Sequence, residues 1–329
     1  MSEIQIIIYC GVGVALFFDF VNGFHDSANS VATVVGTKVL KPIHAALANF
    51  AGPFLFGTAV AATVGKGIIQ PEFSTVSVIL AGLIGGIVWD LITWYFGLPS
   101  SSSHALIGGL IGSALIAGGL KAIVFPGIQK TLTFMVLSPI IGFAIAFAFA
   151  IVIIYAFRNT SNSRVNKLFG KLQIVSSTFF SLTHGANDGQ KTMGVITALL
   201  IAGGLLHSKS FVIPIPVIIV AAAAISLGTF FGGWRIIRTM AFRLTDLKPY
   251  QGFCAETGGG AILTSMALFG IPVSTTHAIA GAIMGVGATR RLSAVRWGVG
   301  KRIVYAWIIT IPASAAIAGV CLFVLKLII

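Results

Sequence analysis

Hydrophobic residues run in long stretches along the whole chain, and short polar connections separate these stretches. The main apolar stretches cover residues 4–18, 76–88, 132–157, 211–231 and 303–329. A helix of about 20 apolar residues is long enough to cross a bilayer, and its backbone hydrogen bonds are all made within the segment. The pattern therefore predicts an all-α polytopic membrane protein without a separate hydrophilic domain.

Composition supports this prediction and orients the chain. Of the residues, 57% are hydrophobic and 9% are charged, against about 25% charged in soluble domains. A net charge of +13 would suggest a nucleic-acid partner in a soluble protein, but here we expect the lipid bilayer and no nucleic acid. Fifteen of the 21 Lys and Arg lie in four short connections, 38–41, 158–171, 235–248 and 290–302. The positive-inside rule places these connections in the cytoplasm and both termini outside a cytoplasmic membrane.

Two unlike motifs recur in the same order, which divides the chain into two halves. Gly-Phe-His-Asp-Ser-Ala-Asn at 23–29 is echoed by Gly-Ala-Asn-Asp-Gly-Gln-Lys at 185–191, and the Pro-hydroxyl-His motif at 97–105 is echoed at 270–278. With all basic connections inside, the halves have opposite orientations, which is the inverted-repeat plan of many transporters. We predict a first repeat over 1–157 (signature 22–29, re-entrant hairpin 76–119), a basic cytoplasmic linker over 158–171, and a second repeat over 172–329 (signature 185–191, re-entrant hairpin 249–289).

Carboxylates inside the apolar segments are the first functional candidates. The chain has only eight acids, and four of them, Asp26, Asp90, Asp188 and Glu256, interrupt apolar segments. A charge at bilayer depth costs at least ~2.5 kcal/mol. Such residues therefore need partners, which are either helix-pairing groups or a transported ion.

The signature motifs favour a cation site. Asp26 and Asn29 are three residues apart and share one helical face, as Asp188 and Lys191 do. Glycines at 23, 185 and 189 predict broken helices here, with free backbone carbonyls. Oxygen ligands suit Na⁺, and a carboxylate can instead take H⁺. Lys191 has three open roles: neutralising Asp188, contacting an anionic substrate, or replacing a cation site of the other half.

The hairpin motifs favour an anion site. A Pro, three hydroxyl residues and a His open a Gly-rich helix at Ser101–His104 and again at Ser274–His277. A helix N-terminus offers unpaired N–H groups and a positive dipole end. Two such starts from opposite faces could meet around a tetrahedral oxyanion. A hydrolase built on Ser102 and His104 is disfavoured because residues two apart on a helix do not face each other, so we predict that the protein is not an enzyme.

These four motifs resemble those of the inorganic phosphate transporter (PiT) family, over essentially the whole chain. The resemblance implies cation-coupled phosphate uptake and a homodimer, with no organic cofactor. It places the coupling cation, Na⁺ or H⁺, at Asp26, Asn29, Asn187 and Asp188. Phosphate would be held by the hydroxyls of Ser101, Ser102, Ser103, Ser274, Thr275 and Thr276, and we add Gln190 and Lys191 to this set. The Gln190-Lys191 ending resembles the short prokaryotic branch, which includes both Na⁺-coupled and H⁺-coupled members.

Two other functions fit the same residues. A carrier of another tetrahedral oxyanion, notably sulfate, could use the same hydroxyl and N–H groups. Phosphate differs in being able to donate a hydrogen bond, so an acidic acceptor in the site would favour it. An anion channel is the second alternative, and the buried acids and inverted plan favour a coupled carrier over it.

Overall fold

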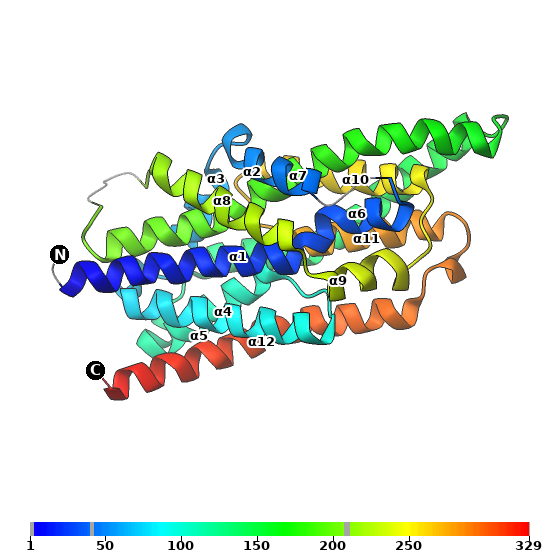
Figure 1. The fold of residues 1–329 in the computed structure, drawn as a ribbon. Coiled ribbons are helices and arrows are strands. Elements are labelled where there is room, and N and C mark those ends of the chain that lie inside the picture. Colours follow the sequence, from blue (N-terminus) through cyan, green and yellow to red (C-terminus); the bar gives the residue numbers. More distant parts are fainter. Residues whose placement is uncertain (1–2, 40–42, 207–210, 329) are drawn as a thin grey trace.

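The computed structural model describes residues 3–39, 43–206 and 211–328, and it is helical nearly throughout (Figure 1). Within these ranges no strand forms, and the one β-bridge joins Ile69 to Ile123. Five of the described helices are long and apolar enough to cross a membrane, or up to seven when two bent pairs are each counted as one span. The predicted all-α polytopic membrane fold is confirmed.

The helices follow the same order in each half of the chain: a long helix, a bent pair, a hairpin and another long helix. The first half contains α1 (Glu3–Thr37), α2 (Ile43–Leu55), α3 (Ala59–Gly67), α4 (Val76–Phe96), α5 (Ser102–Gly118) and α6 (Phe125–Ala156). The second half contains α7 (Asn162–Ala202), α8 (Ile215–Phe231), α9 (Trp234–Arg238), α10 (Pro249–Leu268), α11 (Thr275–Ala288) and α12 (Trp297–Ile328). A π-helical turn at Thr239–Arg243 extends α9.

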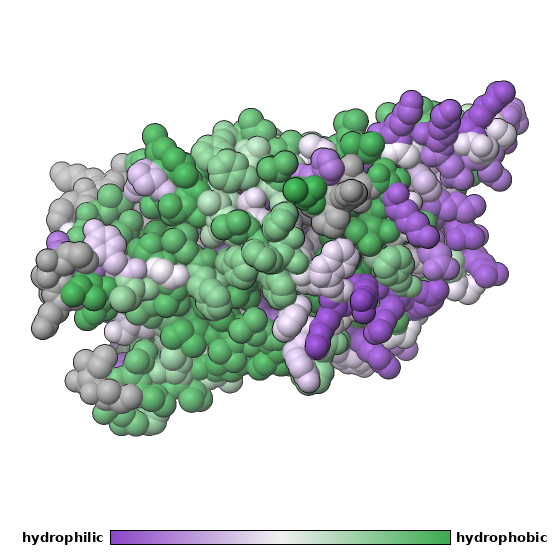
Figure 2. Space-filling model, in the orientation of Figure 1, coloured by the Kyte–Doolittle hydropathy of each residue, from purple (hydrophilic) through white to green (hydrophobic). Residues whose placement is uncertain are grey.

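The two hairpins extend from opposite ends of the molecule. Figure 1 shows α4 and α5 on the side of the termini, whereas α10 and α11 come from the opposite end. The turns at Pro99-Ser100 and Pro272-Val273 are both buried, so each hairpin turns back inside the protein. Hydrophilic residues gather at the end away from the termini (Figure 2), where the α6–α7, α9–α10 and α11–α12 connections carry exposed Lys and Arg.

Glycines bring the two halves into close contact at equivalent places. A Cβ on Gly23 would lie 2.1 Å from the Ile225 carbonyl oxygen of α8, and one on Gly185 would lie 2.1 Å from the Asn49 oxygen of α2. Likewise, α5 packs on α12 and α11 packs on α6. Small residues permit this approach of membrane helices, where dispersion contacts and not water drive association.

The predicted helix breaks at glycines 23, 185 and 189 are wrong, because α1 and α7 run continuously through all three positions. Gly23 and Gly185 serve close packing instead. Broken helices do occur, but between α2 and α3, bent by 80°, and between α8 and α9, bent by 58°.

The signature helices, α1 and α7, carry the two signature motifs. At each bend, a side chain of the signature helix from the other half accepts backbone N–H groups. The Gln190 side-chain oxygen on α7 accepts the backbone N–H groups of Val60 (3.0 Å) and Ala61 (3.4 Å) at the start of α3. The Ser27 hydroxyl on α1 accepts the Gly233 N–H at 2.8 Å, directly before α9. Freed backbone donors in a bilayer need such partners, so the signature helices hold both bends in place.

One predicted connection differs from expectation, and another lies partly outside the described residues. The basic segment 158–171 is mostly helical, because α7 already begins at Asn162. Arg158 precedes this helix, and the exposed Arg164, Lys167 and Lys171 lie on its first turns. Of the predicted connection 38–41, residues 40 and 41 lie outside the described residues.

Candidate substrate and cation site

The N-termini of α5 and α11 meet in the interior of the molecule. The rings of His104 and His277, one from each helix, lie 4.3 Å apart between centroids. His277 also stacks on Trp307 of α12 at 3.8 Å, and the Trp307 indole donates a hydrogen bond to the Pro99 carbonyl at 3.0 Å. The predicted meeting of the two hydroxyl-rich helix starts is thus observed, and both starts are buried.

The first hydroxyl of each triplet caps its own helix. Ser101 accepts the backbone N–H of His104 at 3.3 Å, and Ser274 accepts that of His277 at 3.1 Å. An N-cap of this kind satisfies one of the free donors of the first turn. Ser101 and Ser274 therefore have a local structural role. The other two hydroxyls of each triplet are not used as caps.

Three of the four remaining hydroxyls connect the hairpins to α1 and α7, the helices that carry the signature motifs. Thr275 donates to Asp188 at 2.7 Å, and the Asn29 amide donates to Thr275 at 3.1 Å and to Thr276 at 2.9 Å. Ser103 accepts a hydrogen bond from Lys191. The Ser102 hydroxyl is buried beside the Asp90 carboxylate and makes no hydrogen bond of regular geometry, so of these groups it is the one most available to a substrate.

The two signature carboxylates lie close together. Oxygens of Asp26 and Asp188 and a ring nitrogen of His184 all lie within 4.8 Å of one another. Asp188 contacts Lys191 at 2.5 Å and His184 at 3.1 Å. Asp26 contacts His25 at 2.7 Å through one oxygen, whereas its second oxygen has no partner. Carboxylate oxygens in this arrangement can hold a small cation.

Amide groups near the carboxylates supply further oxygens. The side-chain oxygens of Asn22, Asn29 and Asn187 are buried without a partner. Asn187 donates its NH₂ group to the backbone oxygens of Thr183 (2.9 Å) and Leu263 (3.1 Å), which fixes the orientation of its oxygen. Gln190 differs, because its oxygen holds the start of α3. Asp26, Asn29 and Asn187, three of the four residues predicted to bind the cation, thus each keep an oxygen without a partner. Gln190, which was predicted to bind phosphate, instead contacts the bend between α2 and α3.

Asp19 was missed by the sequence reasoning. It is fully buried on α1 and accepts a hydrogen bond from Thr192 at 2.9 Å, with its other oxygen unpartnered. A signal was present, because Asp19 lies seven residues before Asp26, two helical turns along the same face. Asp90 on α4 was identified, and both its oxygens are buried without a partner.

A second buried cluster of polar side chains is centred on Glu256 of α10. Its carboxylate accepts hydrogen bonds from Thr33 (2.6 Å), Gln173 (3.1 Å) and Ser176. All three donors are neutral groups of α1 and α7. Glu256 thus ties the second hairpin to both signature helices.

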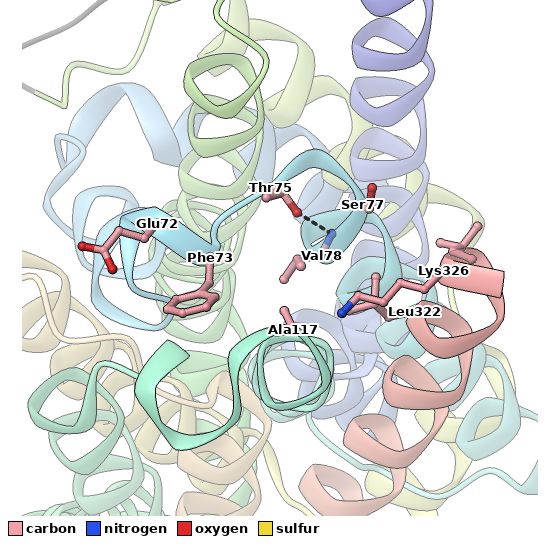
Figure 3. A pocket seen from close by; sticks show the side chains of 9 residues that line it. Glu72, Phe73, Thr75, Ser77, Val78, Ala117, Leu322 and Lys326 are labelled. Carbon is pink, nitrogen blue, oxygen red and sulfur yellow. Dashed lines mark hydrogen bonds between the residues drawn. The ribbon is translucent and has the colours of Figure 1, made fainter. Parts of the chain in front are cut away.

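The cavity in Figure 3 is separate from this buried cluster. It has a volume of about 360 Å³ and lies where α4 begins and α12 ends, with Thr75, Val78, Ala117 and Lys326 among its lining residues. No member of the two motifs lines it. The polar residues of the motifs are themselves at most 5% exposed, so the candidate site is closed to both ends of the molecule.

The fold and the buried polar cluster define a polytopic membrane transport protein. The chain belongs to the phosphate transporter family, whose model matches residues 22–164 and 154–318. This result confirms the resemblance noted in the four motifs.

Curated relatives cover nearly the full chain. A probable low-affinity inorganic phosphate transporter of Rhizobium meliloti is 52% identical over 96% of this chain and 96% of its own length. One of Bacillus subtilis with the same description is 44% identical, covering 95% and 96%. Among solved structures, a sodium-dependent phosphate transporter aligns with a TM-score of 0.88 at 26% identity, over 98% of this chain and 100% of that chain.

Proposed function

We propose that this protein carries inorganic phosphate across the membrane together with a coupling cation, Na⁺ or H⁺, by alternating access. The observation that carries the proposal is the meeting of two helix N-termini, α5 and α11, beside two buried carboxylates, Asp26 and Asp188. The names of the relatives support phosphate as substrate, and the sodium dependence named for the structural neighbour supports a cation.

The helix N-termini would hold the phosphate oxygens. Their free N–H groups and dipoles attract an anion, and the Ser102 hydroxyl adds an unpartnered group. An anion beside Asp26 and Asp188 would be repelled unless a cation shares the site. Because each ion needs the other's charge in a low-dielectric interior, binding of the two is coupled, which is the basis of symport. The substrate leaves chemically unchanged.

Alternating access would use the two halves, 1–157 and 172–329, as inverted repeats. Their hairpins extend from opposite ends (Figure 1), so movement of one hairpin or the other would open the closed site to a different side. The basic end faces the cytoplasm by the positive-inside rule, with both termini outside a cell membrane. A homodimer, implied by the family resemblance, completes the proposal.

Phosphate is favoured over sulfate by the buried acceptors. Both oxygens of Asp90 and one oxygen of Asp26 lack a hydrogen-bond donor. Protonated phosphate can donate to such groups and sulfate cannot, and a site with unmatched acceptors rejects the ligand that cannot donate. Sulfate is therefore expected to compete poorly with labelled phosphate.

Uptake into proteoliposomes tests the proposal. We expect ³²P-phosphate to accumulate above equilibrium under an inward Na⁺ gradient or an inward H⁺ gradient, but not without one. Accumulation under one gradient identifies the coupling ion. Phosphate entry that never exceeds electrochemical equilibrium would instead indicate a channel, and sulfate accumulation without phosphate accumulation would indicate another oxyanion as substrate.

The phosphate site is tested by removing two hydroxyls. The double variant Ser102→Ala/Thr275→Ala is expected to raise the KM for phosphate by roughly tenfold or more. Ser102 would lose its hydrogen bond to phosphate and Thr275 its hydrogen bond to Asp188 at the site, and each hydrogen bond to a charged group is worth about 1.5–3 kcal/mol. A matched control is Ser113→Ala, whose buried hydroxyl on α5 bonds only within its helix, to Leu110. An unchanged KM in the double variant would place the anion site elsewhere.

A further inference from the structure

We infer that the ammonium group of Lys191 takes the place of a transported cation in the second half of the protein. In this arrangement, only the Asp26 side of the cluster binds an exchangeable cation. The inference rests on the proposed cation coupling and specifies how many cation positions this chain uses.

Three oxygens surround the Lys191 nitrogen. They are a carboxylate oxygen of Asp188 at 2.5 Å, the Val273 carbonyl at 2.7 Å and the Ser103 hydroxyl. Carboxylate, carbonyl and hydroxyl oxygens are the ligands that a hard cation takes in proteins. The side chain is only 2% exposed, so the ammonium group lies where a bound ion would lie.

The first half differs at the equivalent position. Asn29 follows Asp26 by three residues, as Lys191 follows Asp188. The Asn29 NH₂ group is used by Thr275 and Thr276, while its oxygen and one oxygen of Asp26 have no partner. The first signature therefore keeps open oxygens where the second is filled by a tethered positive charge.

The charges lead to the same conclusion. Lys191 neutralises Asp188 permanently, because its stem is fixed to α7 and the ammonium group cannot leave with the substrate. Asp26 contacts His25 directly, and the nearby Asp188 is already paired with Lys191, so the negative charge of Asp26 is the one that an exchangeable monovalent cation would balance. A chain with an amide at both positions would have two such charges to balance.

A direct role for Lys191 in holding phosphate is disfavoured by its hydrogen bonds. An ammonium group has three donors, and Asp188, Val273 and Ser103 occupy three directions around it. No donor remains for an anion while these contacts are kept. Lys191, predicted from the sequence as a substrate-binding residue, is thus better described as an internal cation.

The test replaces Lys191 with Asn, which restores the Asp-x-x-Asn pattern of the first half. Purified Lys191→Asn is expected to unfold at a lower temperature than wild type in choline buffer, and Na⁺ at fixed pH should recover several degrees. Lys191→Met offers no hard oxygen, so Na⁺ should stabilise it no more than it stabilises wild type. Lys191→Gln, with a longer amide, provides a second variant should Lys191→Asn give no folded protein.

Uptake gives an independent reading. In proteoliposomes, Lys191→Asn is expected to show a steeper dependence of phosphate uptake on Na⁺ than wild type. The inference is overturned if Na⁺ stabilises the two amide variants no more than it stabilises wild type and Lys191→Met. It is also overturned if Lys191→Asn raises the KM for phosphate with cation dependence unchanged, which would make Lys191 a phosphate ligand. Absence of phosphate accumulation by wild type would reject the proposed function, while the thermal comparison still tests Lys191.

Discussion

Cation-driven phosphate accumulation is expected to be lost in the Asp26→Asn variant while the fold is retained. One oxygen of Asp26 contacts His25 at 2.7 Å and the other has no partner, so a neutral amide of the same shape removes the carboxylate charge and still offers His25 a polar partner. Coupled uptake should fall by at least about tenfold, which corresponds to about 1.4 kcal/mol of lost cation binding. Uptake under the driving gradient and thermal unfolding of the same preparation measure the two effects.

Asp246→Asn is the matched control for this charge removal. Asp246 pairs with Arg296 at 3.2 Å, but the side chains are 76% and 49% exposed. Exposed pairs of this kind contribute about 0–1 kcal/mol, so both uptake and stability should stay near wild type. If Asp26→Asn accumulated phosphate as wild type does, the exchangeable cation would not bind at Asp26.

Asp188→Asn is expected to destabilise the protein strongly, in contrast to Asp26→Asn. Lys191 and Asp188 form a buried ion pair at 2.5 Å, with side chains 2% and 0% exposed. Removing one partner of a buried pair leaves an uncompensated charge and costs about 3–5 kcal/mol. The melting temperature of the purified variant should therefore fall well below that of wild type.

The double variant Asp188→Asn/Lys191→Met distinguishes an unpaired charge from lost packing. With both charges removed, most of the lost stability should return, because neutral replacements of a buried pair are often tolerated. Transport should not return, since the double variant lacks a carboxylate of the cluster. A double variant that is no more stable than Asp188→Asn would show that the two charges do not stabilise each other.

The sequence was most informative where the two halves repeat each other. Recurrence of the signature and hairpin motifs predicted that Asp26 and Asp188 lie in one site with two helix starts, and the structure brings these groups together. The sequence could not show which hydroxyl caps its helix and which is available to a substrate. Ser101 caps its helix while Ser102 is free, and neighbours in a hydroxyl triplet differ only by the direction in which each side chain points.

The glycines of the signatures show why the helix breaks were misplaced. Glycine weakens a helix, but it also lets a neighbouring backbone approach, and the residue type is the same in both cases. Gly23 serves close packing, because the carbonyl of Ile225, from the other half of the chain, lies where a Cβ would be. One of the two bends that do exist, between α2 and α3, follows Pro53. It is stabilised by Gln190, which is far away in sequence.

Ser27 and Gln190 lie directly beside Asp26 and Lys191 along the chain, yet their side chains hold the bends at α9 and α3. A small rotation of α1 or α7 on ion binding would therefore pull on a bend in the opposite half. By thermodynamic reciprocity, straightening that bend would alter ion affinity by the same factor. The two bends would thus connect ion occupancy in the centre of the protein to the angle between helices that carry none of the proposed ion ligands.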